Sequence, residues 1–157
     1  MENVRVLSVS IFDHWLTEKE ASDCEIMNYS TAVENHVLDK YLIGENKFIN
    51  LYASLGDKAI CYLDNERKNV LLTNSVEFKS YLIKGLREKQ FHLHHIIYPT
   101  KDITIRGGYD RTDLFILDER INICDVSILY EAVSLNGLFI LEDTVMDYKE
   151  YVKSCEE

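Results

Sequence analysis

Short apolar runs alternate with segments of helical periodicity along most of the chain, and this alternation constrains the fold more than any other feature. The runs are residues 47–54, 69–73, 91–98, 112–118 and 137–142. Apolar strands between helices are typical of a parallel sheet that helices cover on both faces, with right-handed crossovers. The sequence therefore predicts an α/β fold with a doubly wound, mainly parallel five-stranded sheet in the order 3-2-1-4-5.

Helix signals fall between these runs. Thr17-x-x-Glu20 and Thr31-x-x-Glu34 are capping-box patterns, and Gly44 suits the left-handed end of the helix that follows the second box. Further helices are expected over residues 57–65, 74–89 and 124–134, and from Thr144 to about Cys155.

One proline and six glycines in 157 residues leave little room for long linkers, so we expect a single domain over residues 1–157. Residues 1–45 would form an N-terminal strand and helices, with residues 3–12 as an added edge strand. Residues 46–157 would form the core of the domain. Within it, Phe115, Ile116, Phe139 and Ile140 are expected in the interior, because central parallel strands are buried on both faces.

The net charge of −10 argues against nucleic acid and anionic membranes as partners, because phosphate binding relies on many Lys and Arg contacts. No apolar run approaches the roughly 20 residues that span a bilayer, and the N-terminus has no export signal, so a cytoplasmic location is expected. Four well-separated cysteines without a C-x-x-C pair indicate free thiols.

Two segments resemble the nucleotide-binding part of class I S-adenosylmethionine-dependent methyltransferases. They are DLFILDERINICDVSILYEAVSLNGLFILED (Asp113–Asp143) and FINLYASLGDKAICYL (Phe48–Leu63). The resemblance implies a Rossmann-like domain with S-adenosylmethionine as its cofactor. The residues it places around the cofactor are Ser54, Leu55, Gly56, Asp57 and Asn74, and it places Asp118 near the reacting centre.

The cofactor motif departs from the pattern of that family. Family members have several glycines after the first strand, whereas this chain has only Gly56, beside a crowding Leu55. Asn74 stands where the family has an acid that binds the ribose hydroxyls, and Asn74-x-x-Glu77 also fits a capping-box variant. The last two strands of the family have no counterpart.

Carboxylates follow the last two predicted strands and would meet at one rim of a parallel sheet. Asp118 with Glu119, and Glu142 with Asp143, would together suit a divalent cation, or would simply cap the following helices. We assign no metal. His94 and its histidine neighbours lie at the opposite end of the predicted strand, which favours a structural role. Residues 98–112 are a candidate contact loop for a substrate or a partner.

These patterns indicate a methyltransferase-like domain with a degenerate cofactor motif, acting as a non-catalytic binding or interaction protein. One alternative is an S-adenosylmethionine-dependent methyltransferase of small molecules. Another is an acidic inhibitor or immunity-type protein, whose charge of −10 would speed encounter with a basic protein partner. The expected partner is thus a small molecule or a basic protein.

Overall fold

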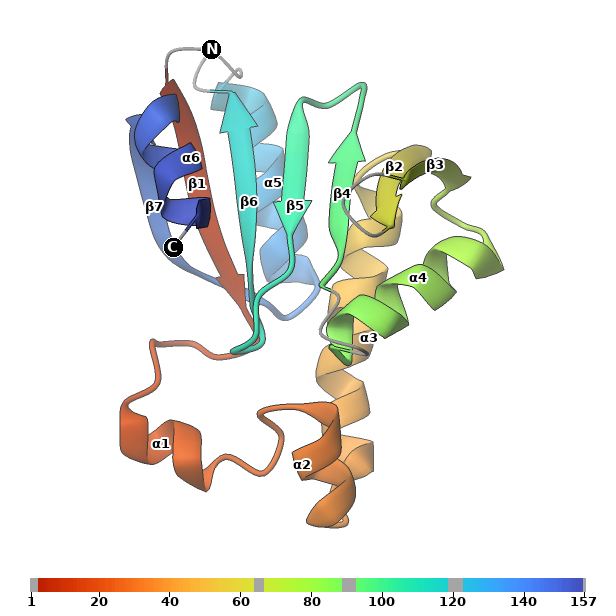
Figure 1. Ribbon diagram of the computed structural model, residues 1–157, viewed down its shortest axis with the longest axis vertical. Helices are drawn as coiled ribbons and strands as arrows, with labels where there is room; N and C mark the ends of the chain where they lie inside the picture. Colours follow the sequence, from red (N-terminus) through yellow and green to blue (C-terminus); the bar gives the residue numbers. More distant parts are fainter. Residues whose placement is uncertain (1–2, 64–66, 89–92, 119–122, 157) are drawn as a thin grey trace.

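The computed structural model describes residues 3–63, 67–88, 93–118 and 123–156 of the chain (Figure 1). The strands are β1 (Asn3–Ser10), β2 (Lys58–Leu63), β3 (Arg67–Leu72), β4 (His95–Tyr98), β5 (Ile103–Arg106), β6 (Thr112–Asp118) and β7 (Phe139–Asp147). The helices are α1 (Glu18–Asp23), α2 (Tyr29–Glu34), α3 (Leu38–Ser54), α4 (Val76–Leu86), α5 (Ile123–Leu135) and α6 (Tyr148–Glu156).

The strands form one seven-stranded sheet in the order β3-β2-β4-β5-β6-β1-β7, and every neighbouring pair runs antiparallel. The N-terminal strand β1 lies between β6 and β7. Its Leu7 pairs with Phe115 of β6 on one side and with Asp143 of β7 on the other. The predicted strand at residues 3–12 therefore exists, but it is an interior strand rather than an edge.

The prediction of a parallel sheet in the order 3-2-1-4-5 is wrong. β6 and β7 do run in the same direction and are joined through α5, as the strand–helix–strand pattern indicates. However, β1 lies between them and is antiparallel to both. The local pattern determines the direction of the two strands, whereas the strand that fills the gap comes from the other end of the chain.

Residues 47–54 form the C-terminal half of α3 instead of a strand. Phe48, Leu51 and Tyr52 are all buried there, at three- and four-residue helical spacing. A short apolar run fits a buried strand and a buried helix equally well, so periodicity alone does not separate the two.

Gly44 does not end its helix, contrary to the sequence prediction. It lies inside α3, where an added Cβ would come within 2.6 Å of the Arg111 Nη2. The glycine therefore makes room for a side chain from the other half of the domain.

Several other helices and strands also differ from their predictions. Residues 57–65 contain strand β2 in place of a helix, and β5 lies in the segment predicted as a contact loop. The final helix begins at Tyr148 because β7 continues to Asp147. The Thr17 capping box is confirmed, but α2 is capped by Asn28, whose side chain accepts the Thr31 N–H at 2.8 Å.

The core lies mainly on one face of the sheet. There α3, α4 and α5 pack their apolar side chains against Leu7, Phe115 and Ile105 of the strands (Figure 1). On the opposite face, α6 joins β1 and β6 in a small apolar cluster of Tyr151 with Val4, Val6 and Ile116. We call these two sides the inner and the outer face.

The predicted core residues are partly confirmed. Phe115 and Ile116 are buried, with 0% and 8% of their surface exposed. The prediction that Phe139 is buried is wrong, because 43% of its surface is exposed at the start of the edge strand β7. Ile140 is only half-buried. An edge position in an antiparallel sheet does not bury both faces of a strand as a central parallel position does.

Two of the cysteines expected as free thiols are unpaired in the structure: Cys24 is half-buried and Cys61 is buried. Burial raises the pKa of the Cys61 thiol to about 12, which leaves it protonated and unreactive at neutral pH. Across the described residues, no helix has both the length and the apolar character that crossing a bilayer requires.

Candidate functional site

The residues predicted to surround a cofactor after the first strand lie instead at the end of a helix. Ser54 is the last residue of α3 and donates its hydroxyl to the Leu51 carbonyl at 2.7 Å, and Leu55 is the C-cap residue and packs against the core. Gly56 and Asp57 form the turn into β2. These residues terminate a helix, and no glycine-rich strand-to-helix turn exists here.

Asn74 is brought close to this turn by its neighbour Thr73. The Thr73 hydroxyl donates to the Gly56 carbonyl at 2.5 Å, and the Thr73 N–H donates to the Asp57 carbonyl at 3.0 Å. Asn74 itself is exposed, and the N-cap of α4 is Ser75, whose hydroxyl accepts the Phe78 N–H. The capping-box interpretation of Asn74 is therefore off by one residue.

The predicted rim of carboxylates is not formed. Asp118 lies opposite Val4 and Glu142 lies opposite Ser8, so the two acids are at different levels of β1. Strands β4 and β5 also separate Asp118 from the turn before β2. β6 and β7 run in the same direction, but β7 continues to Asp147, so Glu142 lies inside its strand whereas Asp118 ends β6, and β1 lies between the two strands.

Asp143 has a structural role at the sheet edge. Its Oδ1 accepts the Arg5 Nε–H at 2.8 Å, its Oδ2 accepts from Nη2 at 2.6 Å, and the Tyr130 hydroxyl donates to Oδ2 as well. These bonds lower the pKa of Asp143, the Arg5 hydrogen bond being the main cause. Within the described ranges, no group of three or more His, Cys, Asp or Glu side chains could hold a metal ion; Glu119 lies outside those ranges.

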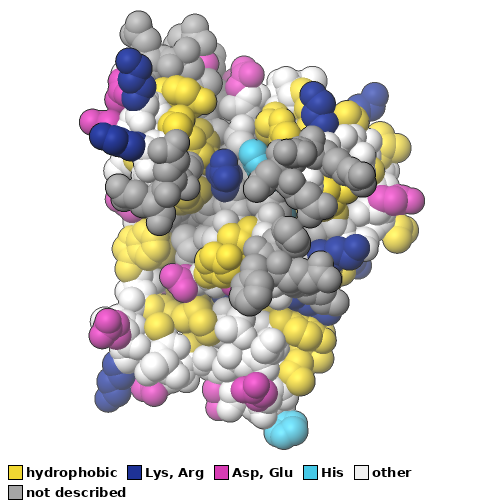
Figure 2. Space-filling view, in the orientation of Figure 1, with side chains coloured by type: hydrophobic (Ala, Val, Ile, Leu, Met, Phe, Trp, Pro, Cys, Tyr) yellow, Lys and Arg dark blue, Asp and Glu magenta, His cyan; other side chains and the backbone are white. Residues whose placement is uncertain are grey.

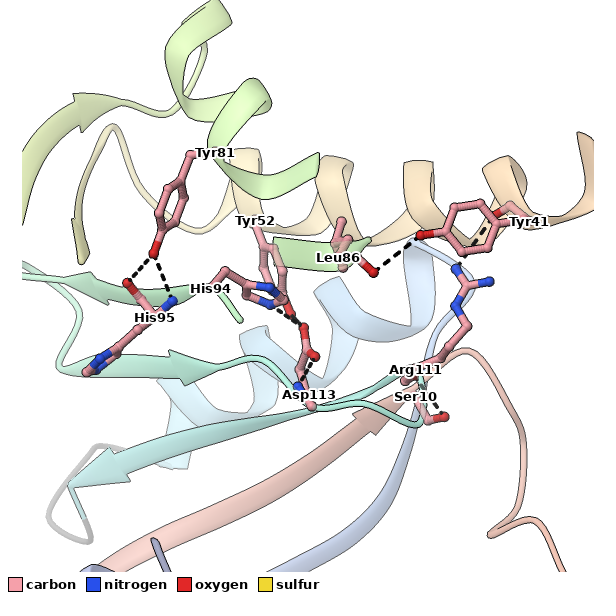
Figure 3. Close-up of polar contacts among 10 residues, drawn as sticks. Ser10, Tyr41, Tyr52, Tyr81, Leu86, His94, His95, Arg111 and Asp113 are labelled. Atoms are coloured by element: carbon pink, nitrogen blue, oxygen red, sulfur yellow. Dashed lines mark hydrogen bonds and ion pairs between the residues drawn. The ribbon is translucent and has the colours of Figure 1, made fainter. Parts of the chain in front are cut away.

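A buried polar cluster joins α3, β6 and the residue before β4. The Asp113 carboxylate accepts the Tyr52 hydroxyl, the His94 Nε2 at 2.7 Å and the Gly108 N–H at 3.0 Å. Figure 3 shows Asp113 beside the side chains of Tyr52, which comes from α3, and His94, which precedes β4. Tyr, His and Asp together are common in catalytic sites, so access to this cluster decides what it can do.

The cluster is closed to solvent and to ligands. The side chains of His94 and Asp113 are 1% and 2% exposed, and Tyr52 is fully buried. Added Cβ atoms at Gly85 and Gly107 would lie 2.6 and 2.7 Å from His94 atoms, so backbone encloses the imidazole. The structural role expected for His94 is in line with this position, since its side chain lies inside the core.

A second network fixes the segment between β1 and α3. The Arg111 guanidinium lies 4.3 Å above the centre of the Tyr41 ring and donates Nη1–H to the Ile26 carbonyl at 3.0 Å. Arg111 is 8% exposed, and this burial lowers its pKa. Its φ of 55° is a left-handed conformation that a long side chain rarely adopts, and the surrounding contacts must offset that strain.

Further contacts reinforce the attachment. The Arg87 guanidinium lies 4.3 Å above the Tyr29 ring of α2 and binds both oxygens of Glu45 at 2.8 and 2.9 Å. At the end of β1, the Ser10 hydroxyl accepts from Thr112 at 2.9 Å. Residues far apart in the sequence thus hold one segment firmly to the domain.

That segment, residues 13–36, carries six acidic side chains and one lysine, and we call it the acidic arm. It holds α1 and α2 below the sheet in the view of Figure 1. The acidic side chains are Asp13, Glu18, Glu20, Asp23, Glu25 and Glu34, and all of them are exposed. Figure 2 shows acidic side chains among hydrophobic ones over this part of the surface.

Trp15 is the most conspicuous residue of the acidic arm, because 53% of its surface is exposed. It borders a pocket of about 100 Å³ whose walls include Ser10, Asp110 and Thr112 from the sheet side and Met27 from the arm. The sequence prediction missed Trp15. The signal available was its setting: the one tryptophan of the chain stands among polar residues rather than in an apolar run.

His14 stabilises the arm beside Trp15. Its two ring nitrogens lie 2.6 Å from an Asp13 oxygen and 2.7 Å from a Glu20 oxygen. A carboxylate only accepts hydrogen bonds, so both contacts are satisfied when the imidazole carries both protons. The hydrogen bonds to Asp13 and Glu20 accordingly raise the pKa of His14.

Comparison of the chain with protein-family models, with curated proteins and with solved structures found no match.

Proposed function

We propose that this chain is a non-catalytic binding protein whose acidic arm docks on a basic surface of a partner protein. The observation that carries the proposal is the exposed Trp15 near the start of a segment with six exposed acidic side chains. Tryptophan is enriched among the residues that dominate protein–protein binding, and an exposed indole attracts the cationic side chains of a partner.

Electrostatics support a basic partner. The net charge of −10 would steer a basic protein toward this chain, and the arm concentrates a charge of −5 within 24 residues (6 acids, 1 lysine). The hydrogen bond from Arg111 to the Ile26 carbonyl and the contact of Arg87 with the Tyr29 ring hold the arm in place before a partner arrives. A preformed surface loses less conformational entropy on binding.

Among the described residues, the cluster of catalytic residue types around Asp113 is closed to solvent, and this favours a binding role over a catalytic one. Tyr52, His94 and Asp113 have catalytic residue types, but they are buried. The argument for S-adenosylmethionine depended on a parallel sheet, and the antiparallel order removes that argument. An inhibitor or immunity-type role, in which the arm covers a basic site of its partner, fits these features.

The test is affinity capture from a cell extract with matched variants. Trp15→Ala removes the indole, and Glu18→Lys with Asp23→Lys reverses two exposed charges of the arm without touching the Thr17 capping box. The control is Glu131→Lys with Glu150→Lys, which changes the net charge equally at exposed sites outside the arm.

We expect a basic protein that the parent chain and the control retain and that both arm variants lose by about tenfold or more, followed by calorimetry with that purified partner. Equal retention of every captured protein by the parent and both arm variants would show that the arm is not the binding surface.

A further inference from the structure

The outer face of the sheet is covered unevenly. α6 packs against β1 and β7, and its Tyr151 forms an apolar cluster with Val4, Val6 and Ile116. Beyond it, no described helix packs on the outer face of β3, β2, β4 and β5. We call this half the uncovered face; it is independent of the acidic arm and of the function proposed for it.

The uncovered face is apolar at its centre. Strand register places Val70 of β3 opposite Ile60 of β2, and Ile60 opposite Ile97 of β4. Leu72 lies two residues along β3 from Val70, opposite Lys58, and all four aliphatic side chains are on the outer side. Val70 is 64% exposed and Leu72 is 53% exposed, while the two isoleucines are half-buried. Adjacent exposed aliphatic side chains on a sheet mark a contact site more often than scattered ones do.

The charges on this face are opposite in sign to those of the whole chain. Alternation along the strands places Lys58, Lys68 and Arg106 on the outer side, and all three are exposed. No acidic residue occupies an outward position in the described parts of β2, β3, β4 or β5. Figure 2 shows hydrophobic, basic and histidine side chains together over this side of the molecule.

The geometry points to an amphipathic helix of a partner protein, with an aliphatic stripe and acidic flanks, as the occupant of the uncovered face. The stripe would cover Val70, Leu72 and Ile97, and the flanks would meet Lys68 and Arg106. On the other half of the same face, α6 already packs against β1 and β7 in this way, with its Tyr151 in an apolar cluster.

Size and charge favour this occupant over two others. Four strands about 4.8 Å apart span about 14 Å, which a helix of about 12 residues crosses. A second copy placed symmetrically would bring Lys68 and Arg106 against basic groups of the same kind. Single-stranded nucleic acid would need open aromatic rings, but Tyr62 is stacked on His95 with ring centres 4.6 Å apart.

The test uses the full chain as bait for a phage-displayed library of helical peptides with randomised surface positions. Bound peptides are then measured on three variants: Val70→Thr with Leu72→Gln, Lys68→Glu with Arg106→Glu, and the control Ile128→Thr with Leu135→Gln. The control changes aliphatic residues of α5 that are 63% and 79% exposed. Circular dichroism establishes that each variant is folded.

We expect selected peptides to carry aliphatic residues at helical spacing with Asp and Glu beside them. They should bind the parent chain, the control and Trp15→Ala alike, and lose at least tenfold in affinity on the first variant and severalfold on the charge reversal. The inference is overturned if no selected peptide distinguishes the face variants from the control or if the selected peptides are basic. It is also overturned if sedimentation shows that this face forms a dimer that Val70→Thr with Leu72→Gln abolishes.

Discussion

The Nε2 atom of His94 lies 2.7 Å from Oδ2 of Asp113, with 1% and 2% of the two side chains exposed. The contact links the residue before β4 to β6, although β5 lies between these strands. Asp113 also accepts bonds from Tyr52 and Gly108, so one carboxylate satisfies three donors in the core. A buried carboxylate is tolerated where such donors replace its lost hydration.

Replacement of Asp113 by alanine should be among the most damaging single changes to stability. It leaves the His94 and Tyr52 side chains and the Gly108 N–H without their acceptor, and removal of one partner from a buried charged network costs about 3–5 kcal/mol. Urea unfolding of Asp113→Ala measures this loss, with the exposed Asp110→Ala as control. A loss below about 1 kcal/mol would mean that the cluster is not a main support of the core.

Gly85→Ala should destabilise the protein even though alanine is the better helix former. In an exposed helix this change would stabilise by about 1 kcal/mol. Here the new Cβ would lie 2.6 Å from the His94 Cβ and 2.7 Å from its backbone nitrogen, and backbone cannot rotate away. Thermal unfolding of Gly85→Ala beside Ser80→Ala, an exposed position of the same helix, separates the two effects. A higher melting temperature for Gly85→Ala would contradict the close packing of His94.

Stability should fall on mild acidification partly because of His95. Burial, together with the charge of the neighbouring Arg106, lowers the pKa of its imidazole from 6.5 to about 4. Between these pH values the unfolded chain binds a proton that the folded chain does not, so stability rises with pH across this window and is lost as pH falls through it.

His95→Gln should flatten that dependence. At about pH 8 the substitution removes only the stacking on Tyr62, so the difference between unfolding free energies at about pH 8 and about pH 4.5 isolates the protonation effect. An unchanged slope in His95→Gln would show that other groups account for the acid sensitivity.

Arg111→Lys should loosen the acidic arm without unfolding the sheet. A lysine cannot reproduce the planar stacking on Tyr41 together with the hydrogen bond to the Ile26 carbonyl. We expect amide hydrogens of α2 to exchange about tenfold faster, while those of β1 and β6 remain protected. Arg106→Lys, at an exposed position, serves as the control. Unchanged exchange in α2 would mean that Arg87 and Glu45 alone hold the arm.

Local signals in the sequence predicted several elements well. Strand β6 occupies the predicted residues 112–118, α5 covers residues 124–134, and the capping box at Thr17 starts α1. These elements follow from contacts between residues a few positions apart: alternating or continuous apolar side chains and a hydroxyl within reach of a backbone N–H.

The acidic character and the lack of clustered cysteines were likewise properties of the sequence alone, because net charge and spacing do not depend on the fold. In contrast, the importance of Trp15 required the structure. Whether an indole is buried or exposed depends on which elements pack against it, and residues 13–36 pack through Arg111, which lies far away in the sequence.

Only the tertiary structure decided the sheet order and therefore the site. The sequence determined that β6, α5 and β7 follow one another and that the two strands run in the same direction, because those features come from short-range periodicity and connection length. It did not determine that β1 pairs between them, since cross-strand pairing energies are similar for many apolar partners and the choice is made by burial of the whole face. That insertion separates β6 from β7, and because Glu142 lies inside β7 whereas Asp118 ends β6, the two acids do not meet at one rim.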